Sequence, residues 1–81
     1  MRRRIPLADI VPTRQGKDGE RDGRRYRVVR ASIRELGVIE PLVVCPQEGA
    51  SARYRLIDGH LRHLVLRDLG ETEVECIIAG E

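Results

Sequence analysis

A five-residue stretch, Asp58-Gly59-His60-Leu61-Arg62, joins an apolar run to a segment with helical spacing. The start of a helix presents free backbone N–H groups and the positive end of the helix dipole, and a glycine there lets an anion approach the backbone closely. Arg62 adds a forked, charge-assisted hydrogen-bond donor, and His60 adds another donor. The stretch therefore predicts a phosphate-binding turn.

The same stretch also fits a purely structural role. Asp58 would cap the helix, Gly59 would make the turn and Arg62 would be solvated. On this short motif alone the structural interpretation is the simpler one. A phosphate site therefore needs support from the rest of the chain.

Two helices and several strands must position this turn. From about Asp22, apolar residues (Tyr26, Val29, Ile33 and Leu36) recur every three or four positions opposite a row of arginines, which predicts a helix ended by Gly37. Residues 61–69 predict a second helix, closed by Gly70. Strands are expected at residues 5–11, 41–45, 54–57 and 74–78, with 41–45 buried on both faces. This order predicts an α+β fold with a small mixed sheet and two helices.

Composition restricts the class of protein. The chain has 81 residues, enough for one domain, and its aromatic residues are two tyrosines, so the core must be aliphatic and base stacking is not expected. The formal net charge of +2 is well short of that of a domain that grips duplex DNA by itself. No run of residues suits a membrane span or a signal peptide, so we expect a cytoplasmic protein. Cys45 and Cys76 lack partners at metal-ligand spacing and are predicted to be core residues.

The order of motifs resembles the N-terminal domain of ParB/RepB-type partition proteins over nearly the whole chain, a family also called ParB-like nuclease and sulfiredoxin-like in fold. The Ser-Ile…Gly…Pro…Val pattern at residues 32–43 matches the end of the family's first helix and its next strand. Gly59 and Arg62 match the glycine and second arginine of the family's Gly-Glu-Arg-Arg turn, whereas His60 and Leu61 replace the two residues between them. The Asp-Gly-His-Leu-Arg form is similar to the RepB-like plasmid branch.

This resemblance implies a domain that binds a nucleoside triphosphate with Mg²⁺, and CTP is the nucleotide of chromosomal ParB. The phosphates would lie at residues 58–62 and the base near Gly37, Glu40 and Pro41. Glu40 stands where the family prefers Gln, and one arginine of the turn is missing. These departures argue against efficient hydrolysis, so the enzymatic activity to be tested is a weak, CTPase-like one.

The resemblance also implies partners. A basic N-terminal tail in similar proteins engages and stimulates a ParA-type ATPase, which makes Arg2, Arg3 and Arg4 the candidate contact. We expect residues 1–4 to be a mobile tail ahead of a single domain, although a solubilising tail explains the charge equally well. The helix-turn-helix of full-length relatives is absent. We therefore expect a piece of a longer, self-associating protein that is found with the nucleoid or a plasmid and binds DNA through a downstream domain or only weakly.

Three other functions must be weighed. A sulfiredoxin needs a nucleophilic cysteine in the phosphate turn, where His60 and Leu61 stand instead, so that activity is not expected. A metal-dependent nuclease needs several converging carboxylates, and only Asp58 and Glu40 are candidates, so we predict no metal site in the protein itself. A protein-interaction module without a ligand, which binds acidic partners through its arginines, is the remaining alternative.

Overall fold

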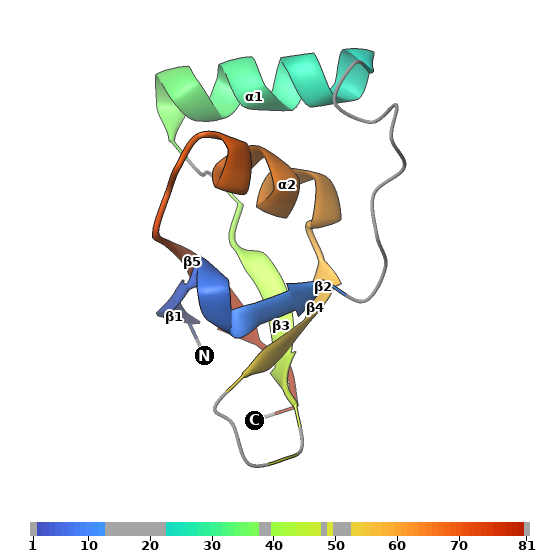
Figure 1. Cartoon of the computed structure of the whole chain (residues 1–81), viewed down its shortest axis with the longest axis vertical. Helices are drawn as coiled ribbons and strands as arrows, with labels where there is room; N and C mark the ends of the chain where they lie inside the picture. Colours follow the sequence, from blue (N-terminus) through green and yellow to red (C-terminus); the bar gives the residue numbers. More distant parts are fainter. Residues whose placement is uncertain (1, 13–22, 38–39, 48, 50–52, 81) are drawn as a thin grey trace.

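The computed structural model describes residues 2–12, 23–37, 40–47, 49 and 53–80. Their elements follow the order β1 (Arg2–Pro6), a short 3-10 helix η1 (Leu7–Asp9), β2 (Ile10–Pro12), α1 (Arg24–Leu36), β3 (Leu42–Pro46), β4 (Tyr54–Asp58), α2 (His60–Asp68) and β5 (Glu73–Ile78). The helices lie together on one side of the sheet (Figure 1). The predicted α+β class is confirmed. Most of the predicted loop at 13–23 lies outside the described residues, as does much of the turn at 47–53.

The strands form one mixed sheet in the order β1-β5-β3-β4-β2. β3 pairs parallel with β5 and antiparallel with β4, and β2 pairs parallel with β4. β1 and β2 lie at opposite edges of the sheet, although only the three residues of η1 separate them in the chain. The sheet must therefore curl until its two edges approach each other.

The N-terminal segment differs from the prediction. The expected strand at 5–11 is two strands, because the chain turns through η1 to pass from one edge of the sheet to the other. Residues 2–4, predicted as a mobile tail, are part of β1 and pair with β5. Arg2 donates to Glu75 at 3.1 Å and Arg4 donates to Glu73 at 2.8 Å. The tail prediction was wrong because β5, the strand with which these residues pair, is distant in the sequence.

A single aliphatic core lies between the curled sheet and α2. Its buried members are Ile5, Leu7, Ile10, Leu42, Val44, Leu56, Leu66, Val74, Cys76 and Ile78. The predicted burial of Cys76 is confirmed, and this burial raises the pKa of its thiol to about 11.

β3 is central in the sheet, as predicted, but only one of its faces is buried. Leu42 and Val44 point into the core, whereas Val43 and Cys45 are half-buried on the other face. The sulfur of Cys45 accepts a hydrogen bond from Arg55 at 3.6 Å. The prediction that Cys45 is a core residue was wrong, because neither α1 nor α2 covers this side of the sheet (Figure 1).

α1 packs mainly on α2 (Figure 1), and its Ile33 also packs against the core. Tyr26 is its buried residue, and the hydroxyl of Tyr26 donates to Asp68 of α2 at 2.6 Å. Leu36 was predicted on the apolar stripe but is 68% exposed, because the C-terminal end of α1 extends past the shorter α2.

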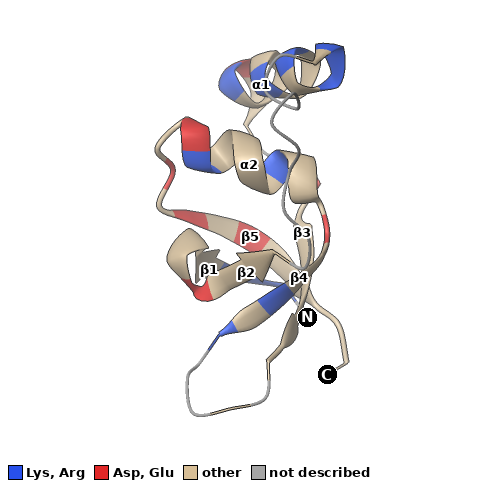
Figure 2. Cartoon of the chain, turned by 45° about the vertical axis from the view of Figure 1, so that its right-hand side comes forward, with Lys and Arg blue, Asp and Glu red and all other residues tan. Residues whose placement is uncertain are grey.

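The charged residues are unevenly distributed over the elements. Basic residues lie along α1, whereas acidic residues lie on β5 (Figure 2). Within the described residues, no helix has the length and apolar character needed to cross a membrane.

Candidate functional site

Gly59 forms the whole junction between β4 and α2. Its φ of 98° and ψ of 28° lie in the left-handed region, which disfavours residues with a Cβ. A Cβ at this position would lie 2.5 Å from Cδ2 of Leu42 and 3.1 Å from Nη2 of Arg62. The conformation and the available space therefore both require glycine at the centre of the predicted turn.

No side chain caps the N-terminus of α2. The Asp58 carboxylate accepts a hydrogen bond from the N–H of Gly59 at 2.9 Å, just before the helix. The first helical hydrogen bond runs from the N–H of His63 to the carbonyl of Gly59 at 2.8 Å. The N–H groups of the preceding turn have no intrahelical acceptor. The structural interpretation, in which Asp58 caps this helix, is therefore not what the structure contains.

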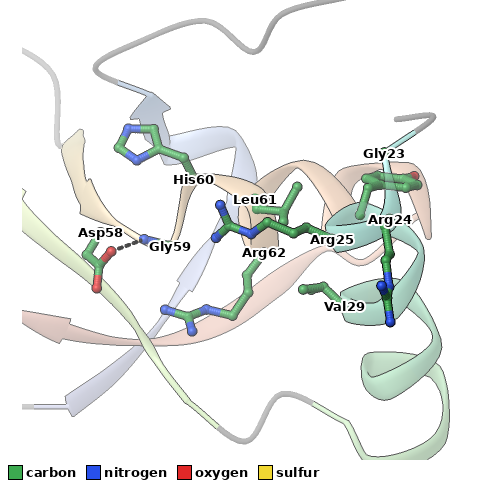
Figure 3. Close-up of a pocket in the computed structure, with 10 residues that line it drawn as sticks. Gly23, Arg24, Arg25, Val29, Asp58, Gly59, His60, Leu61 and Arg62 are labelled. Carbon is green, nitrogen blue, oxygen red and sulfur yellow. Dashed lines mark hydrogen bonds between the residues drawn. The ribbon is translucent and has the colours of Figure 1, made fainter. Parts of the chain in front are cut away.

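A pocket of about 560 Å³ opens between the N-terminal ends of α1 and α2 (Figure 3). It is lined by Gly23, Arg24, Arg25, Tyr26, Val29, Asp58, Gly59, His60, Leu61 and Arg62. The volume lies within the roughly 300–1,000 Å³ that small-molecule sites occupy. All five residues of the predicted turn are thus brought to one concave surface.

The lining carries more positive than negative charge. Arg25 and Arg62 extend toward the Asp58–Gly59 side of the pocket, whereas Arg24 points away from it (Figure 3). Among the described residues, Arg24 and Arg25 form no ion pair. A concave surface with several guanidinium groups and an uncapped helix start suits an anionic ligand.

Arg62 is the most enclosed cation of the site. Its side chain is 24% exposed, and its Nε atom is buried without a hydrogen-bond partner. Its Nη1 atom donates to the carboxylate of Glu40 at 3.0 Å. The structure thus brings Glu40 to the predicted turn, as one of the residues expected near a ligand.

Gly37 and Pro41, which were predicted to lie near a bound base, are not among the residues that line the pocket. Gly37 ends α1 with a φ of 78°, and its N–H donates to the carbonyl of Ile33 at 2.9 Å. Pro41 is half-buried just before β3. Contact of either residue with a ligand stays a prediction.

The contribution of α1 to the pocket was not predicted from the sequence. Arg24 and Arg25 occupy the first turn of a helix that starts at Gly23 without a side-chain cap and without an acidic residue. Cations at this end of a helix oppose its dipole. A pair of arginines placed where they weaken their own helix was therefore the available signal that the start of α1 adds positive charge beside the predicted turn.

His63, next to Arg62, is buried, and its Nε2 atom has no hydrogen-bond partner. Burial is the main cause of a lowered pKa of His63, and the positive charges of Arg67 and His60 lower it further.

Within the described ranges, no group of three or more His, Cys, Asp or Glu side chains is arranged to hold a metal ion.

The curled sheet, the two stacked helices and the cationic turn define a small α+β domain. The family model of the ParB N-terminal domain matches residues 3–80, so the chain belongs to the ParB N-terminal domain family. A nucleoid occlusion protein from Geobacillus thermodenitrificans is 33% identical over 76 residues. That match covers 94% of this chain and 26% of the Geobacillus protein, so this chain spans about a quarter of the relative's length.

Solved structures share the fold at low sequence identity. The C-terminally truncated chromosome-partitioning protein ParB from Caulobacter crescentus, complexed with CTP-γ-S, has a TM-score of 0.76 and 22% identity, covering 96% of this chain and 43% of that one. A free serine kinase mutant in complex with AMP has a TM-score of 0.80 and 22% identity, over 98% and 31% of the chains. Sulfiredoxin from Arabidopsis thaliana has a TM-score of 0.73 and 22% identity, over 100% and 86%. These likenesses confirm the predicted ParB-like, sulfiredoxin-like architecture.

Proposed function

We propose that this domain binds a nucleoside triphosphate in the pocket between α1 and α2, with the phosphates at the turn of residues 59–62. The observation that carries the proposal is the pairing of Gly59 with Arg62. Gly59 supplies the left-handed turn from which the N–H groups of α2 begin, and Arg62 has a buried Nε atom without a partner. A phosphate oxygen would satisfy such a donor and would also accept from the N–H groups of the first turn of α2.

The other lining residues fit the remaining parts of such a ligand. Arg25 extends toward the turn from α1 and would neutralise further phosphate charge (Figure 3). Asp58 is the acidic residue of the lining. Because Mg²⁺ is usually held by one or two carboxylates together with substrate phosphates and water, a magnesium ion would arrive with the nucleotide. CTP is the preferred candidate, since a ParB of the same fold was solved with CTP-γ-S.

We further propose that the domain acts within a DNA segregation protein that self-associates, contacts DNA mainly through other domains and binds a ParA-type ATPase. Arg2, Arg3 and Arg4 are exposed in β1 and remain the candidate contact for that ATPase. The contact would be made by an ordered edge strand, not by a tail. Stimulation of the cognate ATPase by the parent protein, lost when all three arginines are changed to alanine, tests this part of the proposal.

Equilibrium titration of the folded domain with CTP, ATP and GTP, each with and without Mg²⁺, tests the proposed binding. We expect saturable binding of CTP that strengthens with Mg²⁺. Phosphate release measured in the same samples tests for a weak nucleotide hydrolase. Failure of all three nucleotides to bind at millimolar concentration would favour a ligand-free interaction module instead.

A further inference from the structure

The cation at the proposed phosphate position already has an anionic partner within the chain. Arg62 folds back over the turn, so that its Nη2 and Nε atoms lie 3.1 and 3.4 Å from the point where a Cβ on Gly59 would be. Glu40 approaches the same guanidinium from the segment before β3, with 3.0 Å between its Oε2 atom and Nη1 of Arg62. A carboxylate oxygen thus accepts a hydrogen bond from one of the donors that a phosphate would use.

The two partners differ in exposure. The side chain of Glu40 is 76% exposed, whereas that of Arg62 is 24% exposed. Release of the Glu40 carboxylate into water therefore costs little, because most of its hydration is already in place. An enclosed guanidinium without any anion is less favourable, since burial disfavours an unpaired charge. Arg62 is thus arranged to exchange one anionic partner for another.

We propose that Glu40 is a positioning residue that competes with the phosphate for Arg62 and so sets the nucleotide affinity of the site. This inference rests on the proposed nucleotide binding. In the absence of ligand, Glu40 holds the guanidinium over Gly59. A bound phosphate takes over the guanidinium, and Glu40 moves into solvent. Glu40 therefore weakens binding in two ways, by occupying the donor and by repelling the incoming phosphate.

The test compares Glu40→Gln with two variants that separate charge from position. Glu40→Asp retains the negative charge at the same residue. Glu71→Gln removes the same charge from an exposed residue at the opposite end of α2. Each variant is titrated with CTP and Mg²⁺ and, separately, with inorganic tripolyphosphate, a probe that has the phosphates but no base. Thermal unfolding of each variant shows that the fold is retained.

We expect Glu40→Gln to bind both probes about three- to tenfold more tightly than the parent, the range that an exposed ion pair and the repulsion of two like charges allow. Glu40→Asp and Glu71→Gln should bind as the parent does. In an Arg62→Ala background, Glu40→Gln should increase the affinity only slightly, because only the repulsion between Glu40 and the phosphate is removed. If Glu40 had only a structural role, Glu40→Gln would change the melting temperature, and its effect on binding would be the same with and without Arg62.

The outcomes separate this proposal from the proposed function. Binding by the parent with equal or weaker binding by Glu40→Gln would overturn the competition and leave the nucleotide site intact. A gain in Glu71→Gln as large as that in Glu40→Gln would also overturn it, because the effect would then reflect net charge. Failure of the parent and of Glu40→Gln to bind either probe would contradict the nucleotide site itself, and the competition with it.

Discussion

Two arginine-bearing regions of this small domain differ in what surrounds the charges. At the edge of the sheet, Arg2 and Arg4 face Glu75 and Glu73 across paired strands, and all four side chains are largely exposed. At the pocket, Arg24 and Arg25 have no acidic partner among the described residues, and Arg62 is mostly enclosed. At the edge, positive and negative charges balance between the two strands, whereas the pocket has an excess of positive charge.

This difference shows which arginines indicate a function. Exposed ion pairs between neighbouring strands add little stability and are weakened by salt. Arg62 is enclosed beside a turn whose conformation favours glycine, and its ion pair with Glu40 still leaves the buried Nε atom without a hydrogen-bond partner. The three consecutive arginines at the N-terminus are the more conspicuous feature of the sequence, but Arg62 lies in the more enclosed surroundings.

The largest effect is expected where the turn depends on glycine. Gly59→Ala should lower the free energy of unfolding by about 2–4 kcal/mol, because left-handed backbone is costly for alanine and the new Cβ would overlap Leu42. Gly70→Ala is the matched control. Its φ of 78° is also left-handed but nothing lies within 4 Å of the added Cβ, so its cost should be only about 1–2 kcal/mol. Urea unfolding measures both, and equal losses would contradict the tight packing of the turn.

The next effect concerns the enclosed cation. Arg62→Ala should weaken CTP binding by about 1.5–3 kcal/mol, the contribution of hydrogen bonds to a charged group. Arg67→Ala removes an exposed arginine from the last turn of the same helix and should leave the affinity nearly unchanged. Calorimetric titration of both variants provides the measurement. Equal affinities of Arg62→Ala and the parent would exclude Arg62 from the site.

A smaller effect is expected from His63, next to Arg62. Because the pKa of His63 is lowered in the folded protein, the unfolded chain takes up its proton at a higher pH than the folded chain does. The difference in proton uptake adds to the free energy of unfolding. This stabilisation is complete above about pH 6.5 and is lost as the pH falls from there to the lowered pKa of His63. Urea unfolding at about pH 7.5 and pH 5.5 should show this loss in the parent and a smaller one in His63→Leu. The same loss in both proteins would assign it to other groups.

The smallest effect is expected at the sheet edge. Changing Arg2 and Arg4 together to alanine should lower the melting temperature only slightly, because both ion pairs are exposed. The difference from the parent should shrink further in about 1 M salt, where the screening length is roughly 3 Å. Thermal unfolding at low and high salt measures this. A large loss that salt does not reduce would mean that β1 depends on these arginines for more than surface pairing.

Local signals predicted much of this molecule. Gly37 and Gly70 are left-handed glycines at the ends of the two helical segments, so those boundaries could be read from single residues. The alternation around Cys76 predicted both a strand and its inward face. The turn at Gly59 was predictable because a strand, a glycine and a helix follow one another directly. In each case the deciding interactions lie within a few residues of one another.

The remaining features depend on which distant segments meet. The register that sets Arg4 opposite Glu75 joins the two ends of the described chain, so nothing near residue 4 predicts a strand there. The half-exposed position of Cys45 depends on which side of the sheet the helices cover. The contribution of Arg25 to the pocket follows from the stacking of α1 on α2, which the amphipathic pattern of α1 alone does not specify.

Backbone amide NMR shows residue by residue whether phosphates bind at the uncapped start of α2, as we propose. Titration of isotopically labelled domain with CTP and Mg²⁺ should shift the amide signals of Gly59, Leu61 and Arg62 more than those of Arg2 and Arg4 in β1. Cytidine, which lacks phosphates, should leave the three turn signals nearly unchanged, and tripolyphosphate should shift them. Saturable CTP binding that shifts signals elsewhere but leaves those three amides unperturbed would contradict the account.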